Sequence, residues 1–300
     1  MKDVVRPKRQ RVAWDRWLLF TCAGLVVVLA GSIILFIAQK GLSTFLVNHV
    51  NPVQFLFSSD WAPDRAGAQG GPALGSLIFL AGSLAVSLLA VAVAVPISLS
   101  AAIFATQVAP KLGQRVLQPS LEILAGIPSV VYGWIGLTVL VPTIRAHFGG
   151  LGFSLLAGFM VLSVMITPTI FTVSLDSLRA TPAELREGAY AMGSTRWQVV
   201  RRVLLPAARP GIITGVILGL SRAFGEALAV QMVVGNMREL PSSLLKPMTT
   251  LTSAITMDMP YTVMGSLWNN ALWSMAFLLL LVSCAFIVAT KFIGRREVRA

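Results

Sequence analysis

Residues 176–209, DSLRATPAELREGAYAMGSTRWQVVRRVLLPAAR, form an arginine-rich segment between two long apolar runs. Pro182, with an acid two residues later, is typical of the first turn of a helix. Gly193 interrupts the apolar stripe that follows, and a second short helix is predicted from about Thr195 to Pro206. The pattern predicts an amphipathic helical hairpin, which either lies on a lipid surface or docks onto a partner protein.

The composition of the whole chain is strongly apolar. Of its 300 residues, 56% are hydrophobic and 12% are charged, and the mean hydropathy is +0.79. A soluble chain needs about 25% charged residues to cover its surface. This composition excludes a soluble enzyme and predicts an integral membrane protein.

Six apolar runs reach the roughly 20 residues that a helix needs to cross a bilayer. They are predicted at 17–38, 75–105, 120–141, 152–175, 210–234 and 266–290. A basic N-terminus is predicted at 1–16 and an external loop at 39–74. A core at 75–293 holds the last five spans and the arginine-rich segment, and a short tail lies at 291–300. The predicted fold class is all-α, a polytopic membrane protein with six transmembrane helices.

The distribution of basic residues predicts how these spans are oriented. The two termini and the loops at 106–119 and 176–209 carry 18 Lys and Arg residues, whereas the other loops carry five. Loops rich in Lys and Arg stay in the cytoplasm, so both termini are predicted to be cytoplasmic. Topology therefore explains the net charge of +12, and nucleic acid is not an expected partner.

Three consecutive spans contain an interior proline, at Pro96, Pro128 and Pro168. Proline removes a backbone hydrogen bond and bends or breaks a membrane helix, which is tolerated where neighbouring helices or water satisfy the freed groups. Three such spans in a row indicate the lining of a pathway. At Pro128 and Ser129 an opened helix would turn backbone donors and a hydroxyl toward that pathway, although a simple kink or core packing explains the pair equally well.

Arg222 and Glu226 are two charged residues within the fifth apolar run. At helical pitch they are four residues apart and are predicted to share one face. Each charge near the bilayer centre costs on the order of 2.5 to 3.5 kcal/mol, so neither is expected to face lipid. Either the two neutralise one another, or Arg222 supplies a fixed charge for an anion while Glu226 orients it or acts in gating. Arginine suits an oxyanion because its planar donors match phosphate or carboxylate in pairs.

The arginine-rich segment resembles the EAA loop of ABC importer permeases, whose pattern is E-A-A-x3-G-x9-I-x-L-P. The matching positions are Glu187, Gly188, Ala189, Gly193, Val203, Leu205 and Pro206. The spacing is complete, and the departures are Gly188 for alanine and Val203 for isoleucine. The resemblance implies the type I (MetI-like) importer permease fold, with a loop that couples the spans to an ATP-hydrolysing subunit.

Two further stretches resemble signatures of the PstC family of phosphate permeases. They are EILAGIPSVVYG at 122–133 and RAFGEALAV at 222–230. The resemblance covers nearly the whole chain and implies passage of inorganic phosphate through the cytoplasmic membrane of a bacterium, with roles for Arg222 and Glu226. It also implies contact of residues 184–206 with the ATPase. The implied partners are a second permease PstA, two ATPase subunits PstB and an external binding protein PstS.

The sequence offers no site for ATP or for a metal. It contains no Gly-x4-Gly-Lys-Ser/Thr phosphate loop, so ATP and magnesium are expected on the partner ATPase and no cofactor on this chain. His49 and His147 have no carboxylate or cysteine at metal-ligand spacing, and no metal site is expected. The chain is therefore predicted to be a transport subunit rather than an enzyme.

Four alternatives remain open on the sequence. The first two are a PstA-like permease instead of a PstC-like one, and a permease for another oxyanion such as sulfate or molybdate. A membrane enzyme using Arg222 and Glu226 would need a nucleophile, base or metal cluster that the sequence does not show. A proton-coupled secondary transporter would use Glu226 as its relay, and dependence of uptake on ATP would distinguish it.

Overall fold

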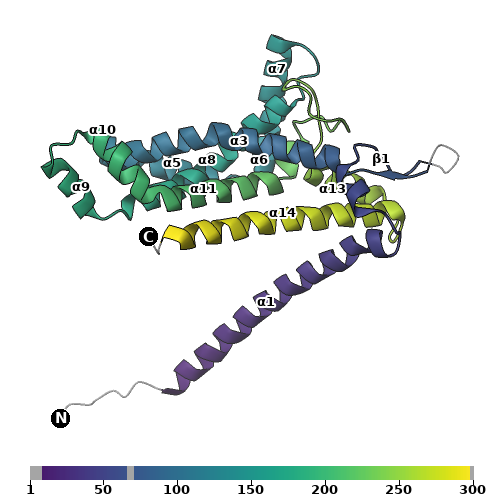
Figure 1. Cartoon of the computed structure of the whole chain (residues 1–300), viewed down its shortest axis with the longest axis horizontal. Helices are drawn as coiled ribbons and strands as arrows, with labels where there is room; N and C mark the ends of the chain where they lie inside the picture. The colour runs from purple at the N-terminus through teal and green to yellow at the C-terminus, as the bar shows by residue number, and fades with distance from the viewer. Residues whose placement is uncertain (1–8, 66–70, 298–300) are drawn as a thin grey trace.

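The computed structural model describes residues 9–65 and 71–297, and within these residues the chain is an elongated bundle of helices. Six helical segments there are long and apolar enough to cross a membrane, as the sequence predicts. Their bounds are Arg16–Leu46, Leu77–Val108, Ser129–Phe148, Leu155–Arg179, Arg196–Gly225 and Leu267–Thr290. The ends of α1 and α14 nearest the chain termini lie toward the end of the bundle that carries α9, and β1 and α13 lie at the opposite end (Figure 1).

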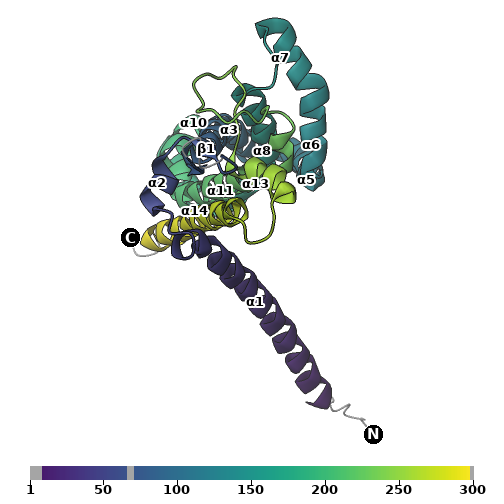
Figure 2. The same cartoon turned by 90° about the vertical axis from the view of Figure 1, so that its right-hand side faces the viewer.

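The first helix, α1 (Arg9–Leu46), diverges from the bundle, as Figures 1 and 2 show, and is longer than the predicted run at 17–38. It meets the last helix, α14 (Leu267–Glu297), only along its C-terminal part. There the rings of Phe36 and Trp273 make an edge-to-face contact with centroids 5.2 Å apart. Ser274 also donates a hydrogen bond of 2.6 Å to the carbonyl of Gly41.

The loop after α1 contains secondary structure of its own. It contains α2 (Pro52–Phe57) and a two-stranded antiparallel sheet of β1 (Trp61–Ala62) and β2 (Ala73–Leu74). Phe55 and Trp61 are buried in an apolar cluster with Phe79 of the next helix. This cluster fixes the loop to the end of the bundle.

The core of the bundle is formed by α3 (Leu77–Ile103), α8 (Leu155–Arg179) and α11 (Leu205–Gly225). Pro96 and Pro168 lie inside α3 and α8, and neither proline ends its helix. Ser98 donates a hydrogen bond of 3.0 Å to the carbonyl of Thr167, so the two helices are joined beside both prolines.

The third predicted run, 120–141, is broken into two helices. The first part is α5 (Gln118–Gly126), and the spanning part consists of α6 (Ser129–Ile135), a π-helical turn (Gly136–Leu140) and α7 (Val141–Phe148). The cause is Pro128, which has no N–H and holds the preceding Ile127 in an extended conformation. The span therefore starts later than predicted and extends past residue 141.

The fifth predicted run, 210–234, differs from the structure at both ends. The span begins with α10 (Arg196–Val199), continues through a π-helical turn (Val200–Leu204) and ends with α11 at Gly225. Pro206 lies in the first turn of α11, which follows the π-helical turn directly, so Pro206 does not end a short helix. The chain then turns at Glu226 into α12 (Leu228–Gln231).

The remaining elements are short. They are a π-helical turn (Phe104–Val108), α4 (Pro110–Leu112), a second π-helical turn (Gly113–Leu117), α9 (Ala183–Ala191), α13 (Leu251–Asp258) and a 3-10 turn (Met259–Tyr261). The helix α13 lies in the second long loop and packs against α3 and α14, so this loop covers one end of the bundle.

Candidate functional site

The end of α11 separates the two charged residues of the fifth span. Arg222 lies in the last turn of α11, whereas Glu226 follows the helix with extended backbone angles of φ −72° and ψ 128°. The prediction that they share one helical face is therefore wrong, because the helix ends at Gly225. They also do not pair as ions within the described residues, so the interpretation that they neutralise one another fails.

Each of the two residues has its own partner. Arg222 donates from Nη1 to the hydroxyl of Thr169 on α8, at 2.9 Å. Glu226 accepts a hydrogen bond of 3.1 Å at Oε1 from the backbone N–H of Ala229, which caps the short helix α12. The carboxylate of Glu226 therefore stabilises the turn after α11, whereas Arg222 keeps its positive charge.

The guanidinium of Arg222 has unused hydrogen-bonding capacity. It carries five N–H donors, and Thr169 takes one of them. No carboxylate lies within ion-pair distance of it in the described part of the chain, and its side chain is exposed in the isolated subunit. The group is thus held in place while several donors stay available to an anion.

The break in the third span lies close to the break in the fifth. A Cβ atom added at Gly133 would lie 2.8 Å from the Cα of Ala229, so α6 and α12 pack backbone against backbone. Tyr132 donates a hydrogen bond of 2.6 Å from its hydroxyl to the carbonyl of Leu124, across the break at Pro128. The structure therefore brings the two interrupted helices together, with Pro128 exposed and Ser129 half-buried beside their junction.

The second long loop is tied to the same region by hydroxyl groups. Thr252 of α13 donates to the backbone carbonyl of Glu226 at 2.7 Å, and Thr256 donates to Oε1 of Gln231 at 2.8 Å. On its other side, α13 is fixed to the bundle by a hydrogen bond of 2.9 Å from the N–H of Leu251 to Ser83. A movement of α13 would therefore be transmitted to the turn at Glu226.

The arginine-rich segment forms a hairpin, here called the α9 hairpin, made of α9 and α10. Gly193 has φ +80°, a left-handed conformation that glycine adopts without strain, and it turns the chain between the two helices. The N-terminus of α10 has a capping box, in which Thr195 and Gln198 bond each other's backbone N–H groups. Both devices fix the hairpin locally.

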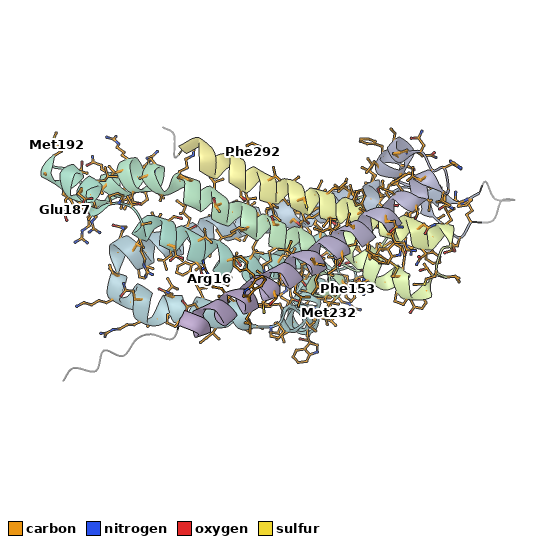
Figure 3. All side chains as sticks on the ribbon, turned by 90° about the horizontal axis from the view of Figure 1, so that it is seen from below. Arg16, Phe153, Glu187, Met192, Met232 and Phe292 are labelled. Carbon is orange, nitrogen blue, oxygen red and sulfur yellow. The ribbon has the colours of Figure 1, made fainter. Side chains whose placement is uncertain are left out.

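One face of the α9 hairpin packs on the bundle and the other is exposed. Ala189 packs against the buried Val199, Val200 and Leu204, and Leu205 joins the same apolar cluster. The outer surface carries the large exposed apolar side chains Leu185, Tyr190, Met192 and Trp197. Figure 3 shows Glu187 and Met192 at one end of the molecule, beyond the end of α14 marked by Phe292.

This arrangement of six spans, interrupted helices and an exposed hairpin agrees with the family to which the sequence is related. Residues 94–299 match the model of the binding-protein-dependent transport system inner membrane component. The chain belongs to this family. It is a permease subunit of an ABC transporter, and as a member of the family it is a multi-pass protein of the cytoplasmic membrane.

Curated relatives of this permease subunit cover most of its length. A probable ABC transporter permease protein YqgH of Bacillus subtilis is 50% identical over 284 residues, covering 94% of this chain and 90% of the relative. The phosphate transport system permease protein PstC of Pasteurella multocida is 36% identical, covering 81% and 79%. The PstC of Mesorhizobium japonicum is 32% identical, covering 91% and 86%.

Solved structures show the same fold at low sequence identity. A bacterial alginate ABC transporter in complex with a periplasmic protein matches with a TM-score of 0.63 at 16% identity, covering 97% of this chain and 98% of that chain. The inward-facing MetNI methionine ABC transporter matches with a TM-score of 0.55 at 21% identity, covering 72% and 92%. The permease subunit therefore has the MetI-like importer fold, as the EAA loop implies.

Thr169 and Tyr132 contribute to the site although the sequence analysis did not single them out as site residues. Thr169 follows the proline in the sequence Thr167-Pro168-Thr169, and a hydroxyl beside a helix-interior proline was a usable signal. Tyr132 lies within the stretch at 122–133, four residues after Pro128. Both contacts depend on which helices are neighbours, which spacing along one chain does not reveal.

Proposed function

We propose that this permease subunit carries inorganic phosphate into the cell, driven by ATP that a separate subunit hydrolyses. One observation carries the proposal: Arg222 donates a hydrogen bond to the neutral hydroxyl of Thr169 and has no carboxylate partner in the described residues. Its positive charge therefore stays uncompensated beside the two helix breaks. Arginine binds phosphate with paired, parallel hydrogen bonds and stays protonated. The relatives named PstC support phosphate as the anion.

The proposed assembly follows that of phosphate importers. This subunit would pair with a second permease of the PstA type, bind two PstB ATPase subunits through the α9 hairpin and receive phosphate from an external PstS protein. ATP and magnesium would bind to PstB. Both termini and the α9 hairpin would be cytoplasmic, and the small sheet and α13 would face outward, which agrees with the basic residues of the termini and hairpin.

In this proposal the spans move relative to one another at the two breaks. Closure of the ATPase subunits displaces the α9 hairpin, and the spanning segment from Arg196 to Gly225 transmits this displacement to the bundle. Arg222 lies at the far end of that helix. Glu226 holds the turn that follows, and Pro128 and Ser129 lie at the neighbouring break, so a rocking of the spans would expose Arg222 to each side alternately.

A permease for another oxyanion is the main alternative. A guanidinium also suits sulfate or molybdate, and the name of the relative YqgH specifies no substrate. The same architecture would also serve a PstA-like partner subunit. Membership of the ABC permease family, by contrast, argues against a membrane enzyme or a proton-coupled transporter.

Uptake of labelled phosphate and labelled sulfate by phosphate-starved cells, with and without this chain, tests the proposal. Loss of high-affinity phosphate uptake alone supports it. Unchanged phosphate uptake with impaired sulfate uptake would replace phosphate by another oxyanion. Depletion of ATP with the proton gradient maintained should stop the uptake.

A further inference from the structure

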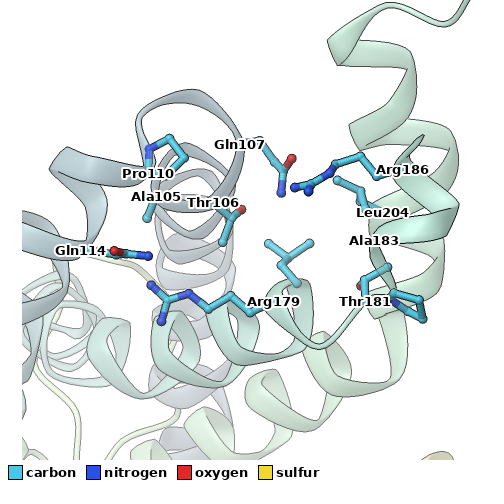
Figure 4. A pocket seen from close by; sticks show the side chains of 12 residues that line it. Ala105, Thr106, Gln107, Pro110, Gln114, Arg179, Thr181, Ala183, Arg186 and Leu204 are labelled. Carbon is cyan, nitrogen blue, oxygen red and sulfur yellow. The ribbon is translucent and has the colours of Figure 1, made fainter. Parts of the chain in front are cut away.

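A polar cavity lies at the α9 end of the molecule, away from Arg222. It has a volume of about 220 Å³ and is lined by the turns between α3 and α5, the end of α8 and the start of α9. We call it the α9 cavity. Its polar lining includes Thr106, Gln107, Gln114, Arg179 and Arg186, which come from four separate elements (Figure 4).

Two arginines give the α9 cavity a positive charge that no acidic lining residue balances. Arg179 and Arg186 both line it, and neither forms an ion pair within the part of the chain that the structure describes. Arg179 donates one hydrogen bond, of 3.1 Å, to Oε1 of Gln118. That amide in turn donates to Glu122 at 2.8 Å, so the carboxylate of Glu122 bonds the amide and not the arginine.

The other polar groups of the α9 cavity are suited to an anion as well. The side-chain amides of Gln107 and Gln114 each offer two N–H donors. Ala183 and Pro182 place the N-terminus of α9 in the wall, and no side chain caps that end of the helix. Uncapped N–H groups and the helix dipole add further positive potential to the two guanidinium charges.

We propose that the α9 cavity binds a phosphate group. The two guanidinium groups line the cavity from different elements, and each can form paired hydrogen bonds with the oxygens of a phosphate. The volume of about 220 Å³ is below the range of roughly 300–1,000 Å³ for drug-sized ligands, which suits a small anion or a single headgroup. Either free inorganic phosphate or the headgroup of an anionic phospholipid would supply this group.

The position of the cavity gives such a ligand a consequence for transport. Arg179 ends the core helix α8, whereas Arg186 lies on α9 of the hairpin that is proposed to contact the ATPase. A phosphate group between them would fasten the hairpin to the bundle and neutralise the repulsion of the two arginines. The ligand would therefore tighten the mechanical link between hairpin and spans.

Hydrogen exchange of the full-length chain in nanodiscs tests this inference. In net-neutral phosphatidylcholine nanodiscs, inorganic phosphate is titrated until the exchange rates no longer change with its concentration. In a second arm, phosphatidylglycerol nanodiscs are used without inorganic phosphate. Exchange of amides in 183–188 is expected to slow by about tenfold in at least one arm. The arm that responds identifies the source of the phosphate group, and no slowing in either arm overturns the inference.

Variants locate the effect in the α9 cavity. The double substitution Arg179→Gln and Arg186→Gln should abolish the slowing, whereas Arg115→Gln, an exposed arginine outside the cavity, should leave it unchanged. Unchanged exchange within α3 checks that the double variant is folded. Slowing that persists in the double variant would overturn the inference.

The inference and the proposed function fail separately. The inference concerns a site away from Arg222, so Arg222→Ala should leave the slowing at 183–188 intact. Conversely, if the chain proves to transport sulfate, the α9 cavity is unchanged. The hydrogen-exchange response to inorganic phosphate or phosphatidylglycerol then still tests the inference.

Discussion

Arg222 of α11 donates a hydrogen bond of 2.9 Å to the hydroxyl of Thr169 on α8, and this contact joins the last turn of one spanning helix to the middle of another. It uses a neutral acceptor, so the arginine is oriented without losing its charge. A carboxylate at the same place would accept the paired N–H groups of Arg222 that an anion would otherwise bind. The pair therefore combines a fixed geometry with a free charge, as a binding group on an anion pathway requires.

Replacing Arg222 should reduce transport in proportion to the donors that are lost. Arg222→Ala removes the charge and should abolish phosphate uptake, whereas Arg222→Lys keeps the charge without the paired donors and should lower uptake by about tenfold or more. Uptake of labelled phosphate into cells measures both, after assembly of the complex is verified on blots. Normal uptake by both variants would leave Arg222 with no role in the pathway.

Thr169 provides a test of orientation separate from charge. Thr169→Val retains the shape but leaves the Arg222 donor unsatisfied, which should lower uptake by about tenfold, since a hydrogen bond to a charged group contributes about 1.5 to 3 kcal/mol. Thr169→Ser keeps the hydroxyl and is the matched control, expected to retain most of the uptake. Equal uptake by the valine and serine variants would show that Thr169 does not position Arg222.

The contact between the two broken helices makes Gly133 sensitive to any side chain. Gly133→Ala places a Cβ atom 2.8 Å from the Cα of Ala229, and overpacking of this kind costs about 1 to 3 kcal/mol. Gly126→Ala is the control, because no atom lies within 4 Å of its added Cβ. Thermal unfolding of the purified chain should show a lower Tm for the first variant only, and equal Tm values would refute the close approach.

The sequence predicted the number of spans but not where the third and fifth begin and end. Run length and hydropathy identify six membrane helices because these depend on composition alone. The helix ends at Gly126 and Gly225 fall inside apolar runs, where hydropathy gives no signal. Pro128 marked the first break, but nothing in the local pattern distinguished Glu226 as a turn residue from Glu226 as a helical partner of Arg222.

The contacts of the candidate site also divide into local ones, which the sequence predicted, and long-range ones, which it did not. The hairpin was predictable because Gly193 and the capping residues act within a few positions of each other. The partners of Arg222 and Glu226 were not, since Thr169 is 53 residues from Arg222 and the contact depends on how α8 and α11 pack.

The two glycines of the α9 hairpin should respond oppositely to alanine. Gly193 has φ +80°, and a left-handed conformation costs alanine about 1 to 2 kcal/mol, so Gly193→Ala should distort the hairpin and lower phosphate uptake several-fold. Gly188 lies inside α9 with no atom near its added Cβ, and Gly188→Ala should stabilise that helix by about 0.5 to 1 kcal/mol. ATPase activity of the reconstituted complex measures coupling, and reduced coupling in Gly188→Ala alone would contradict this assignment.

The pKa of Asp258, at the opposite end of the bundle, makes stability depend on pH. Burial raises the pKa of this carboxyl above its usual range, and Arg238, whose Nη2 donates to both carboxylate oxygens at 2.9 Å, opposes the rise. Because the folded state holds the proton more tightly than the unfolded state, the contribution of Asp258 to stability is greatest below about pH 4 and is lost as the pH rises through the folded pKa. Asp258→Asn does not titrate, so the stability of the native chain relative to this variant should fall over that interval.

Arg238→Gln removes the opposing charge and should shift the interval to higher pH, which thermal unfolding at a series of pH values measures. A native-to-variant difference that rises with pH would show instead that the ion pair outweighs burial and lowers the pKa.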